Sequence, residues 1–147
     1  MKQYRIDPSK GLEFGIYTLG DHLPNPLTGE RISAQERVQE IIEYAKLADE
    51  AGIDFFSVGE SHQEYFATQA HSVVLGAIAQ ATKNIKIASS STIISTSDPV
   101  RVYEDFATID LISNGRAEIV AGRASRVGLF DLLGYDIRHY EELFEEK

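Results

Sequence analysis

Apolar and polar positions along the first part of the chain follow two alternating periods. Residues 12–17 carry an apolar side chain at every second position, which predicts a short strand. Ser33 and Glu36 have the spacing of a capping box, and the apolar positions that follow at helical spacing predict a helix that stops at Gly52. Residues 53–58 are mostly apolar, which predicts a strand buried on both faces. Together these segments predict a β-α-β unit.

The same rhythm continues to the end of the chain. We expect, in order, a helix over residues 72–82, a strand over 85–88, a helix from Asp98 to Asn114, a strand over 117–121 and a helix that begins at Tyr140. The helix that starts at Asp98 is expected to turn four side chains toward the core: Val102, Phe106, Ile109 and Ile112. Strands that alternate with helices indicate a parallel sheet with right-handed crossovers.

The predicted fold class is α/β. Four β/α units are half of an eight-stranded barrel of the (β/α)8 TIM-barrel type, whose usual length is about 250 residues. We therefore expect residues 1–147 to form a single incomplete domain, the first half of such a barrel. A complete four-stranded open sheet with a frayed last helix is the alternative. An incomplete barrel leaves strand edges and an apolar face uncovered, which favours pairing with another copy or aggregation.

Composition and charge narrow the classes of partner. The 147 residues contain 14 Lys and Arg against 23 Asp and Glu, a net charge of −9, which disfavours nucleic acid and anionic membranes as partners. The absence of Cys excludes disulfides and thiolate chemistry. No apolar run approaches the ~20 residues of a membrane span, and the first residues lack the apolar segment of a signal peptide. We expect a cytoplasmic protein.

The carboxyl ends of the predicted strands collect most of the polar and titratable residues. Ligands bind at this edge of the sheet in parallel α/β folds. Glu60 and His62 follow the second strand, and a carboxylate two residues from an imidazole can hold its tautomer for acid–base work. The alternative is that Glu60 accepts hydrogen bonds from backbone amides and that His62 is solvated.

Two further strand ends offer ligand contacts. Residues 89–92 supply hydroxyls and backbone donors, although small residues are also common in ordinary loops. Gly122 and Arg123 combine a close backbone approach with a permanent cation, which suits an anion or phosphate; the alternative is a surface salt bridge. The other histidines are expected to be structural or exposed to solvent: His22, His71 and His139.

Several sharper motifs are absent. The sequence has no P-loop, no glycine-rich dinucleotide fingerprint and no G-x-S-x-G elbow. Its histidines lack the H-x-H and H-E-x-x-H spacings, so no metal site is expected. The 7 Tyr and 7 Phe follow the period of the core without interleaved basic residues, which argues against stacking on nucleic acid.

Six segments carry a resemblance that covers nearly the whole chain: residues 51–62, 98–105, 111–116, 122–125, 133–136 and 141–144. In this order and at this spacing they resemble the bacterial luciferase-like flavin-dependent monooxygenases. Each segment alone is a weak match, but the set is specific. The resemblance implies the N-terminal half of a (β/α)8 barrel that binds reduced FMN at the carboxyl ends of its strands and activates O₂ against an organic substrate.

The resemblance also implies site residues. It assigns a non-proline cis peptide to Ser90–Ser91 beneath the flavin, and a flavin contact to Arg123, with Ala124 and Ser125 beside it. Together with the strand-end residues named above, the cofactor-binding candidates are Ser90, Ser91, Thr92, Gly122, Arg123, Ala124 and Ser125. The family's Glu-His-His after the second strand is Glu60-Ser61-His62 here, so Ser61 replaces the histidine that has a catalytic role in the luciferases. His62 and Glu60 are therefore the catalytic candidates.

Three hypotheses about the function stay open. The first is the N-terminal portion of an FMN-dependent monooxygenase, a homo-oligomer whose partners are a small-molecule substrate, O₂ and a flavin reductase. The second is a non-catalytic flavin-binding or subunit-interaction module, which the departure at Ser61 favours. The third is a relative that uses the deazaflavin F420 on the same scaffold.

Overall fold

A four-stranded parallel sheet forms the centre of the computed structural model, which describes residue 9 and residues 11–147. Its strands, in spatial order, are β1 (Gly15–Thr18), β2 (Phe55–Val58), β3 (Lys86–Ser89) and β5 (Ala117–Glu118). Each neighbouring pair is parallel, and Ile16 lies beside Phe56, which in turn lies beside Ile87. The predicted α/β fold with a parallel sheet is therefore confirmed.

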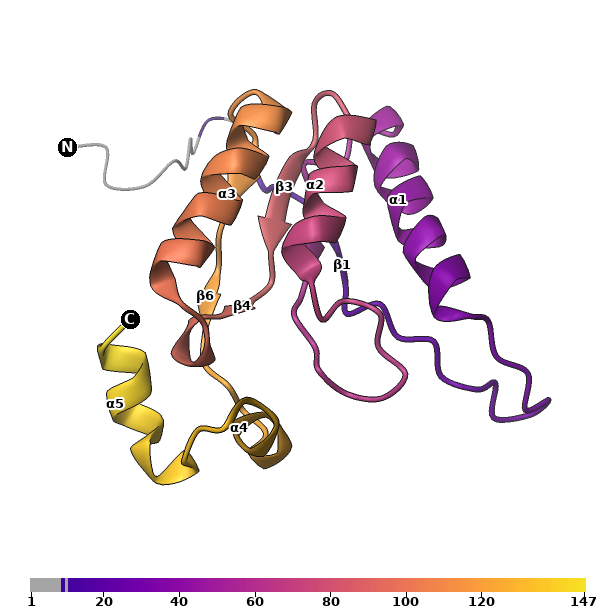
Figure 1. Cartoon of the computed structure of the whole chain (residues 1–147). Coiled ribbons are helices and arrows are strands. Elements are labelled where there is room, and N and C mark those ends of the chain that lie inside the picture. The colour runs from indigo at the N-terminus through magenta and orange to yellow at the C-terminus, as the bar shows by residue number, and fades with distance from the viewer. Residues whose placement is uncertain (1–8, 10) are drawn as a thin grey trace.

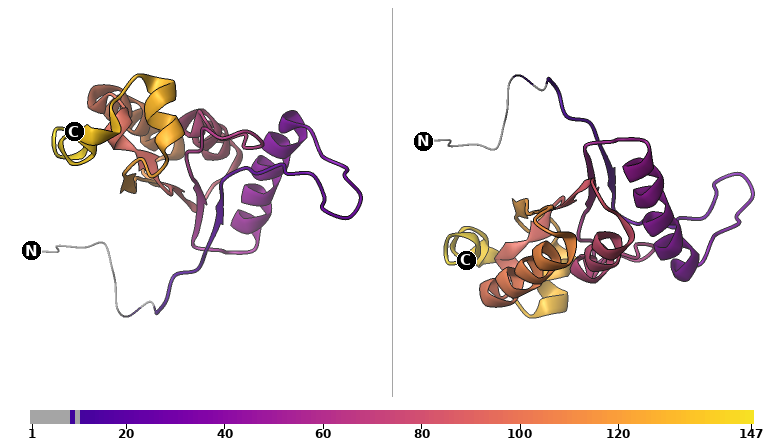
Figure 2. Two further views of the ribbon diagram at one scale, coloured as in Figure 1. Left: turned by 90° about the horizontal axis from the view of Figure 1, so that it is seen from below. Right: turned by 90° about the horizontal axis from the view of Figure 1, so that it is seen from above.

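Three helices cover one face of this sheet: α1 (Ala34–Glu50), α2 (His71–Ala81) and α3 (Pro99–Ser113). Figures 1 and 2 show them side by side, with α2 between α1 and α3. The core between helices and sheet is aliphatic, and its fully buried members include Ile41, Val58, Leu75, Ile78 and Ile87. Burial of each such side chain stabilises the fold by roughly 1.5–3 kcal/mol.

The ends of the helices follow from the local sequence. Ser33 and Glu36 form the predicted capping box, because the Ser33 hydroxyl accepts from the Glu36 amide and the Glu36 carboxylate accepts from the Ser33 amide. Asp98 caps α3 by accepting from two amides of its first turn. The same helix ends at Asn114, whose φ of 58° lies in the left-handed region that Asn tolerates better than most residues.

Arg116, directly before β5, ties the end of α2 to the end of α3. Its guanidinium donates at 2.7–3.0 Å to the carbonyl oxygens of Ala79, Thr82 and Ile85. Its Nε donates to the carbonyl oxygen of Ser113 at 2.8 Å. A cation beside the last carbonyls of a helix pairs their free acceptors and offsets the negative end of the helix dipole.

Asp49, near the end of α1, holds the turn between α2 and β3 from the other side. Its carboxylate accepts from three successive backbone amides, those of Lys83, Asn84 and Ile85, at 2.7–2.9 Å. Partial burial raises the pKa of Asp49, but these hydrogen bonds and the charge of Arg116 outweigh it, so the pKa lies below its usual value. The turn is thereby fixed by an anion and a cation together.

The fourth predicted strand is interrupted in the structure. Residues 117–121 do not form one strand, because β5 ends at Glu118 and β6 (Ala121–Gly122) pairs with β4 (Thr92–Ile93) in a separate two-stranded sheet. At the break, the Ser89 hydroxyl accepts from the Val120 amide at 3.0 Å. A buried side chain therefore takes over a backbone contact where the sheet divides.

Helix α4 (Val127–Leu133) lies in a segment for which the sequence pattern predicts no element. It ends at Gly134, whose φ of 75° is left-handed. A 3-10 turn, η3 (Ile137–His139), leads to α5 (Tyr140–Glu145), where a helix is predicted. Both helices lie beyond the carboxyl ends of the strands (Figure 1). No helix in the described part of the chain has the length and apolarity needed to cross a membrane.

Several apolar positions of the predicted elements face solvent. Ile112 is 40% exposed, because α3 turns Ile109 and Ser113 toward the core, and Ser113 occupies the place expected for Ile112. The first strand is shorter than predicted: β1 begins at Gly15, and Leu12 is 82% exposed. In both places the apolar spacing is present, but the side chain does not face the core between the helices and the sheet.

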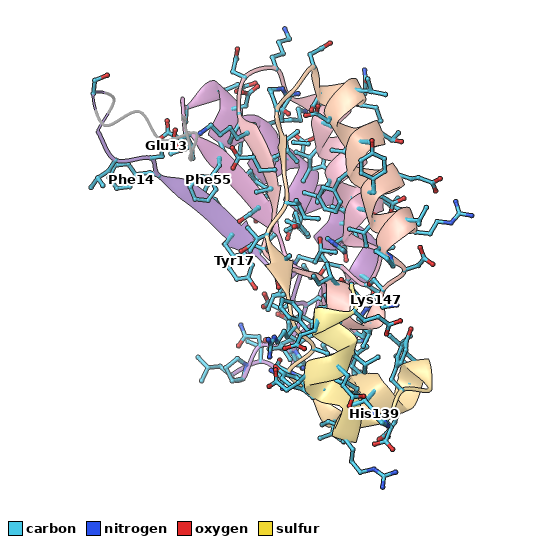
Figure 3. The ribbon with its side chains drawn as sticks, turned by 90° about the vertical axis from the view of Figure 1, so that its left-hand side faces the viewer. Glu13, Phe14, Tyr17, Phe55, His139 and Lys147 are labelled. Carbon is cyan, nitrogen blue, oxygen red and sulfur yellow. The ribbon has the colours of Figure 1, made fainter. Side chains whose placement is uncertain are left out.

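The face of the sheet opposite the helices is open. Figure 3 shows the side chains of Glu13, Phe14, Tyr17 and Phe55 on this side. Lys86 is the register partner of Phe55 and so lies on the same face, where its Nζ is 2.6 Å from Oε1 of Glu13. This face therefore combines exposed aromatic rings with an ion pair.

Candidate functional site

A pocket of about 540 Å³ opens at the carboxyl ends of the strands, between the loops that follow β1, β2 and β3 and the segment between β6 and α4. This volume is typical of sites for small molecules and cofactors. Six of the predicted site residues line it: Glu60, His62, Ser90, Ser91, Arg123 and Ser125. The strand ends thus bring together most of the residues that the sequence singles out.

Glu60 and His62 form a hydrogen-bonded pair in the wall of this pocket. Oε1 of Glu60 lies 2.7 Å from Nε2 of His62, and Oε2 accepts from the amide of Ile93 at 2.7 Å. The side chain of Glu60 is 7% exposed and that of His62 is 20% exposed. The carboxylate of Glu60 therefore contacts the imidazole and also accepts a backbone hydrogen bond, which are the contacts that the two hypotheses expected.

The Ser90–Ser91 peptide, whose two residues line the pocket, is cis, as the family resemblance implies. Two glycines allow other segments to approach it closely. A Cβ at Gly59 would lie 2.5 Å from the carbonyl oxygen of Ser90, and a Cβ at Gly122 would overlap the side chain of Ser91. The backbone amide of Glu60 donates to the carbonyl oxygen of Ser91 at 3.1 Å, so this segment is fixed on the side of β2 as well.

Arg123 lies at the edge of the pocket and is held by α5. Its Nη1 is 2.5 Å from Oε2 of Glu141, and its guanidinium lies 4.2 Å from the centre of the Phe144 ring and 5.5 Å from that of Tyr140. The hydrogen bond to Glu141 raises the pKa of Arg123. Arg123 therefore forms a salt bridge, which was the alternative to a ligand contact, and it also lines the pocket.

Three of the predicted cofactor contacts do not line the pocket. The hydroxyl of Thr92 lies 2.8 Å from Nε2 of His71, which points it away from the pocket. Ala124 is fully buried, and its amide donates to the hydroxyl of Ser95. The backbone of Gly122 packs against the side chain of Ser91. These residues shape the segments that carry the lining residues.

His71, the first residue of α2, lies beside Glu60. Its Nδ1 is 3.8 Å from Oε2 of Glu60, and its side chain is 8% exposed. Burial lowers the pKa of His71, against the charges of Glu60 and Asp105, which raise it. The expectation of a structural residue is right about its burial but omits the contact with Glu60, because eleven positions separate the two residues along the chain and no short motif connects them.

Residues that were not predicted as site residues also line the pocket, among them Tyr17, Phe66, Arg126 and Leu129. The first three lie in the strand-end segments 17–22, 59–66 and 122–126, so their position was available from the sequence. Leu129 lies on α4, whose formation the pattern does not predict. Burial raises the pKa of Tyr17.

The family model of the luciferase-like monooxygenases matches residues 12–147. Among curated proteins, the chain is similar to the N-acetyl-S-alkylcysteine monooxygenase of Bacillus subtilis, with 30% identity over 103 residues, which are 69% of this chain and 31% of that protein. The alkanal monooxygenase beta chain of Vibrio harveyi is 31% identical over 106 residues, 71% of this chain and 31% of that protein. The chain thus spans about a third of the length of these relatives.

Solved structures share the fold. The monooxygenase RslO1 of Streptomyces bottropensis has a TM-score of 0.81 at 24% identity, over 92% of this chain and 40% of that one. The oxygenating constituent of 3,6-diketocamphane monooxygenase from Pseudomonas putida, solved with FMN, has a TM-score of 0.77 at 21% identity, over 91% of this chain and 36% of that one. The F420-dependent tetrahydromethanopterin reductase of Methanopyrus kandleri has a TM-score of 0.61 at 27% identity, over 83% and 30%.

Proposed function

The chain belongs to the luciferase-like monooxygenase family, and on this premise we propose that it forms the N-terminal portion of an enzyme that uses reduced FMN and O₂ to oxidise a small organic substrate. The observation that carries the proposal is a single pocket lined by Arg123, Ser91 and the Glu60–His62 pair. A cation and a hydroxyl suit the phosphate of a flavin nucleotide, and a carboxylate-bound imidazole suits acid–base work beside it.

The chemistry of the pocket fits FMN. Arg123 and Arg126 offer two cations to a phosphate, and the Ser91 hydroxyl offers a further donor. The apolar side chains of Phe66 and Leu129 offer a surface for the ring system. In its reduced form, FMN supplies the electrons that activate O₂, and the protein supplies binding, orientation and electrostatics.

The role of His62 follows from its contact with Glu60. Since the carboxylate accepts the proton of Nε2, Nδ1 of the same ring is left as a proton acceptor. Ser61 stands where the luciferases have their first histidine, lines the same pocket and is 8% exposed. A serine hydroxyl is a much weaker base than an imidazole, so we assign proton transfer to His62.

FMN is the first choice of cofactor because the family resemblance implies it and because a structural neighbour, the Pseudomonas putida enzyme, was solved with FMN. F420 is the second candidate, since the reductase that uses it is 27% identical to this chain. Four further features stay predictions: a homo-oligomer, a flavin reductase as partner, a cytoplasmic location, and residues 1–147 as one incomplete barrel domain.

Titration of FMN with the purified chain, followed by quenching of flavin fluorescence, tests the proposal. We expect saturable binding, which Arg123→Ala weakens by at least about tenfold, the effect of a lost hydrogen bond to a charged group. Arg138→Ala is the matched control, since Arg138 also lies 2.5 Å from a carboxylate oxygen but does not line the pocket. A parallel titration with F420 separates the two cofactors. Equal affinities of the wild type and Arg123→Ala would contradict the assignment.

A non-catalytic flavin-binding or subunit-interaction module is the second candidate function. It is favoured by the open face of the sheet, where Phe14 is 65% exposed, and by the serine at position 61. Light scattering behind a sizing column, with and without FMN, measures whether the chain pairs and carries flavin. Oxidation of reduced FMN by O₂ above the rate of free flavin would favour the enzyme over the module.

A further inference from the structure

A second cavity, of about 320 Å³, lies behind the Glu60–His62 pair. Glu60 lines both cavities and so forms the wall between them, and His71 lines only the second. The imidazole of His71 lies between Oε2 of Glu60, 3.8 Å from Nδ1, and Oγ1 of Thr92, 2.8 Å from Nε2. The ring of Phe106 on α3 packs against it, with 6.2 Å between ring centres.

We propose that His71 is a positioning residue that fixes the segment Ser90–Ile93 against the carboxylate of Glu60, with the proton of Nδ1 directed at Glu60 and Nε2 accepting the hydroxyl of Thr92. Two contacts converge on this segment, because Glu60 accepts the amide of Ile93 at 2.7 Å and His71 bonds the adjacent Thr92. The inference rests on the proposed function only in that this segment shapes the pocket assigned to FMN.

The tautomer follows from the charge of Glu60. A carboxylate oxygen attracts an N–H dipole and repels a nitrogen lone pair, so the negative charge 3.8 Å from Nδ1 places the ring proton there. Nε2 is then an acceptor, and the hydroxyl of Thr92, which rotates freely, donates to it. Thr92 is 2% exposed, so water does not compete effectively for this hydrogen bond.

The ring is neutral in this arrangement. Burial lowers the pKa of His71, and protonation of His62 would lower it too, while the charges of Glu60 and of Asp105 on α3 raise it. Arg101 and Asp98 line the same second cavity and complete its set of charged groups from α3 and its cap. A neutral imidazole can accept from Thr92, whereas an imidazolium has no acceptor atom.

Nitrogen chemical shifts of the wild-type chain test the tautomer directly. Long-range ¹H–¹⁵N spectra of the labelled chain at pH 7 are expected to show His71 protonated at Nδ1 and unprotonated at Nε2. His139, which is exposed at the end of η3, is the reference histidine. A proton on Nε2 of His71, or on both nitrogens, would overturn the proposal.

Substitutions test the positioning role. Thr92→Ser and His71→Gln keep the hydrogen bond between these positions, whereas Thr92→Val and His71→Phe remove it at similar volume. We expect Thr92→Val and His71→Phe to shift the amide signal of Ile93 and to weaken FMN binding about fivefold. Thr92→Ser and His71→Gln are expected to keep the Ile93 signal and the FMN affinity close to those of the wild type. Equal Ile93 signals and FMN affinities in all four variants, with native circular dichroism, would overturn the proposal. If the wild type does not bind FMN, the proposed function fails. The nitrogen chemical shifts of His71 and the amide signal of Ile93 still test the proposal about His71, because neither measurement requires FMN.

Discussion

Nη1 of Arg123 lies 2.5 Å from Oε2 of Glu141, so the cation assigned to the flavin is held by a carboxylate of α5. The ring of Phe144, one turn further along α5, lies 4.2 Å from the same guanidinium. An anionic ligand in the pocket therefore shares Arg123 with a charge of the same sign as its own. The last helix of the chain thus influences the pocket without lining it.

Glu141→Gln is expected to strengthen FMN binding by about two- to fivefold at low ionic strength, because it removes the charge that competes for Arg123. The gain should shrink at high salt, where exposed charges are screened. Fluorescence titration at two salt concentrations measures both effects. Glu142→Gln is the control, since Glu142 pairs with His139 instead. Weaker binding by Glu141→Gln would mean that Glu141 orients Arg123.

His62→Ala is expected to lower substrate oxidation by about 10²-fold, the usual contribution of a general acid or base, while FMN affinity changes by less than about twofold. The physical reason is that the imidazole is bonded to Glu60 rather than placed among the cationic groups of the pocket. Steady-state rates of the FMN-loaded enzyme and a flavin titration give the two numbers. His139→Ala is the control for an exposed histidine. Equal loss of both properties would make His62 a structural residue.

Arg116→Ala is expected to lower the free energy of unfolding by about 2–4 kcal/mol, because it leaves several carbonyl oxygens at the ends of α2 and α3 without a donor. Urea denaturation followed by circular dichroism measures the change. Arg101→Ala is the matched control: its guanidinium is 80% exposed and pairs only with Glu104 in the part of the chain described, so its loss should cost less than about 0.5 kcal/mol. Similar losses in both variants would contradict the role of Arg116.

Asp49→Asn is expected to destabilise the fold most at neutral pH. Since the pKa of Asp49 lies below its usual value, its hydrogen bonds stabilise the fold fully above the unfolded-state pKa of about 3.9, and this stability is lost as the pH falls from there through the folded-state pKa. The stability difference between wild type and variant should therefore shrink below about pH 4. Urea midpoints at pH 7 and at acid pH measure it, with the exposed Asp131→Asn as control. A difference independent of pH would contradict the assignment.

The order of strands and helices was predictable because each depends on local spacing. The capping box at Ser33 and the start of α3 at Asp98–Pro99 each depend on residues close together in the sequence, and both form as predicted. The division of the fourth strand was not predictable, since it depends on Ser89, which lies 31 residues from Val120 along the chain. Helix α4 was missed for a similar reason: its two buried residues, Leu129 and Phe130, belong to a separate cluster that includes Tyr140 and Leu143 of α5 rather than to the main core.

The candidate site was predictable where it follows strand ends. Glu60, His62 and Arg123 all lie where parallel strands deliver them, and the pocket brings them together. His71 was not predictable in this way, because it is the first residue of α2 and does not follow a strand. It lies near Glu60 only because the loop between the two residues folds back. The direction of the Thr92 hydroxyl was not predictable either, since the sequence does not show which of the two cavities the side chain of a strand residue faces.

The turn between α2 and β3 lies at the surface, yet its amides are bound. Lys83 and Asn84 are exposed, but their N–H groups donate to the carboxylate of Asp49, and Arg116 holds the carbonyl oxygens on either side. Solvent exchange of an amide proton requires that its hydrogen bond open, and here opening would move a segment that is held both by Asp49 of α1 and by Arg116. The amide protons of Lys83 and Asn84 should therefore exchange with deuterated water about as slowly as those of the central strands, although both residues are exposed to solvent.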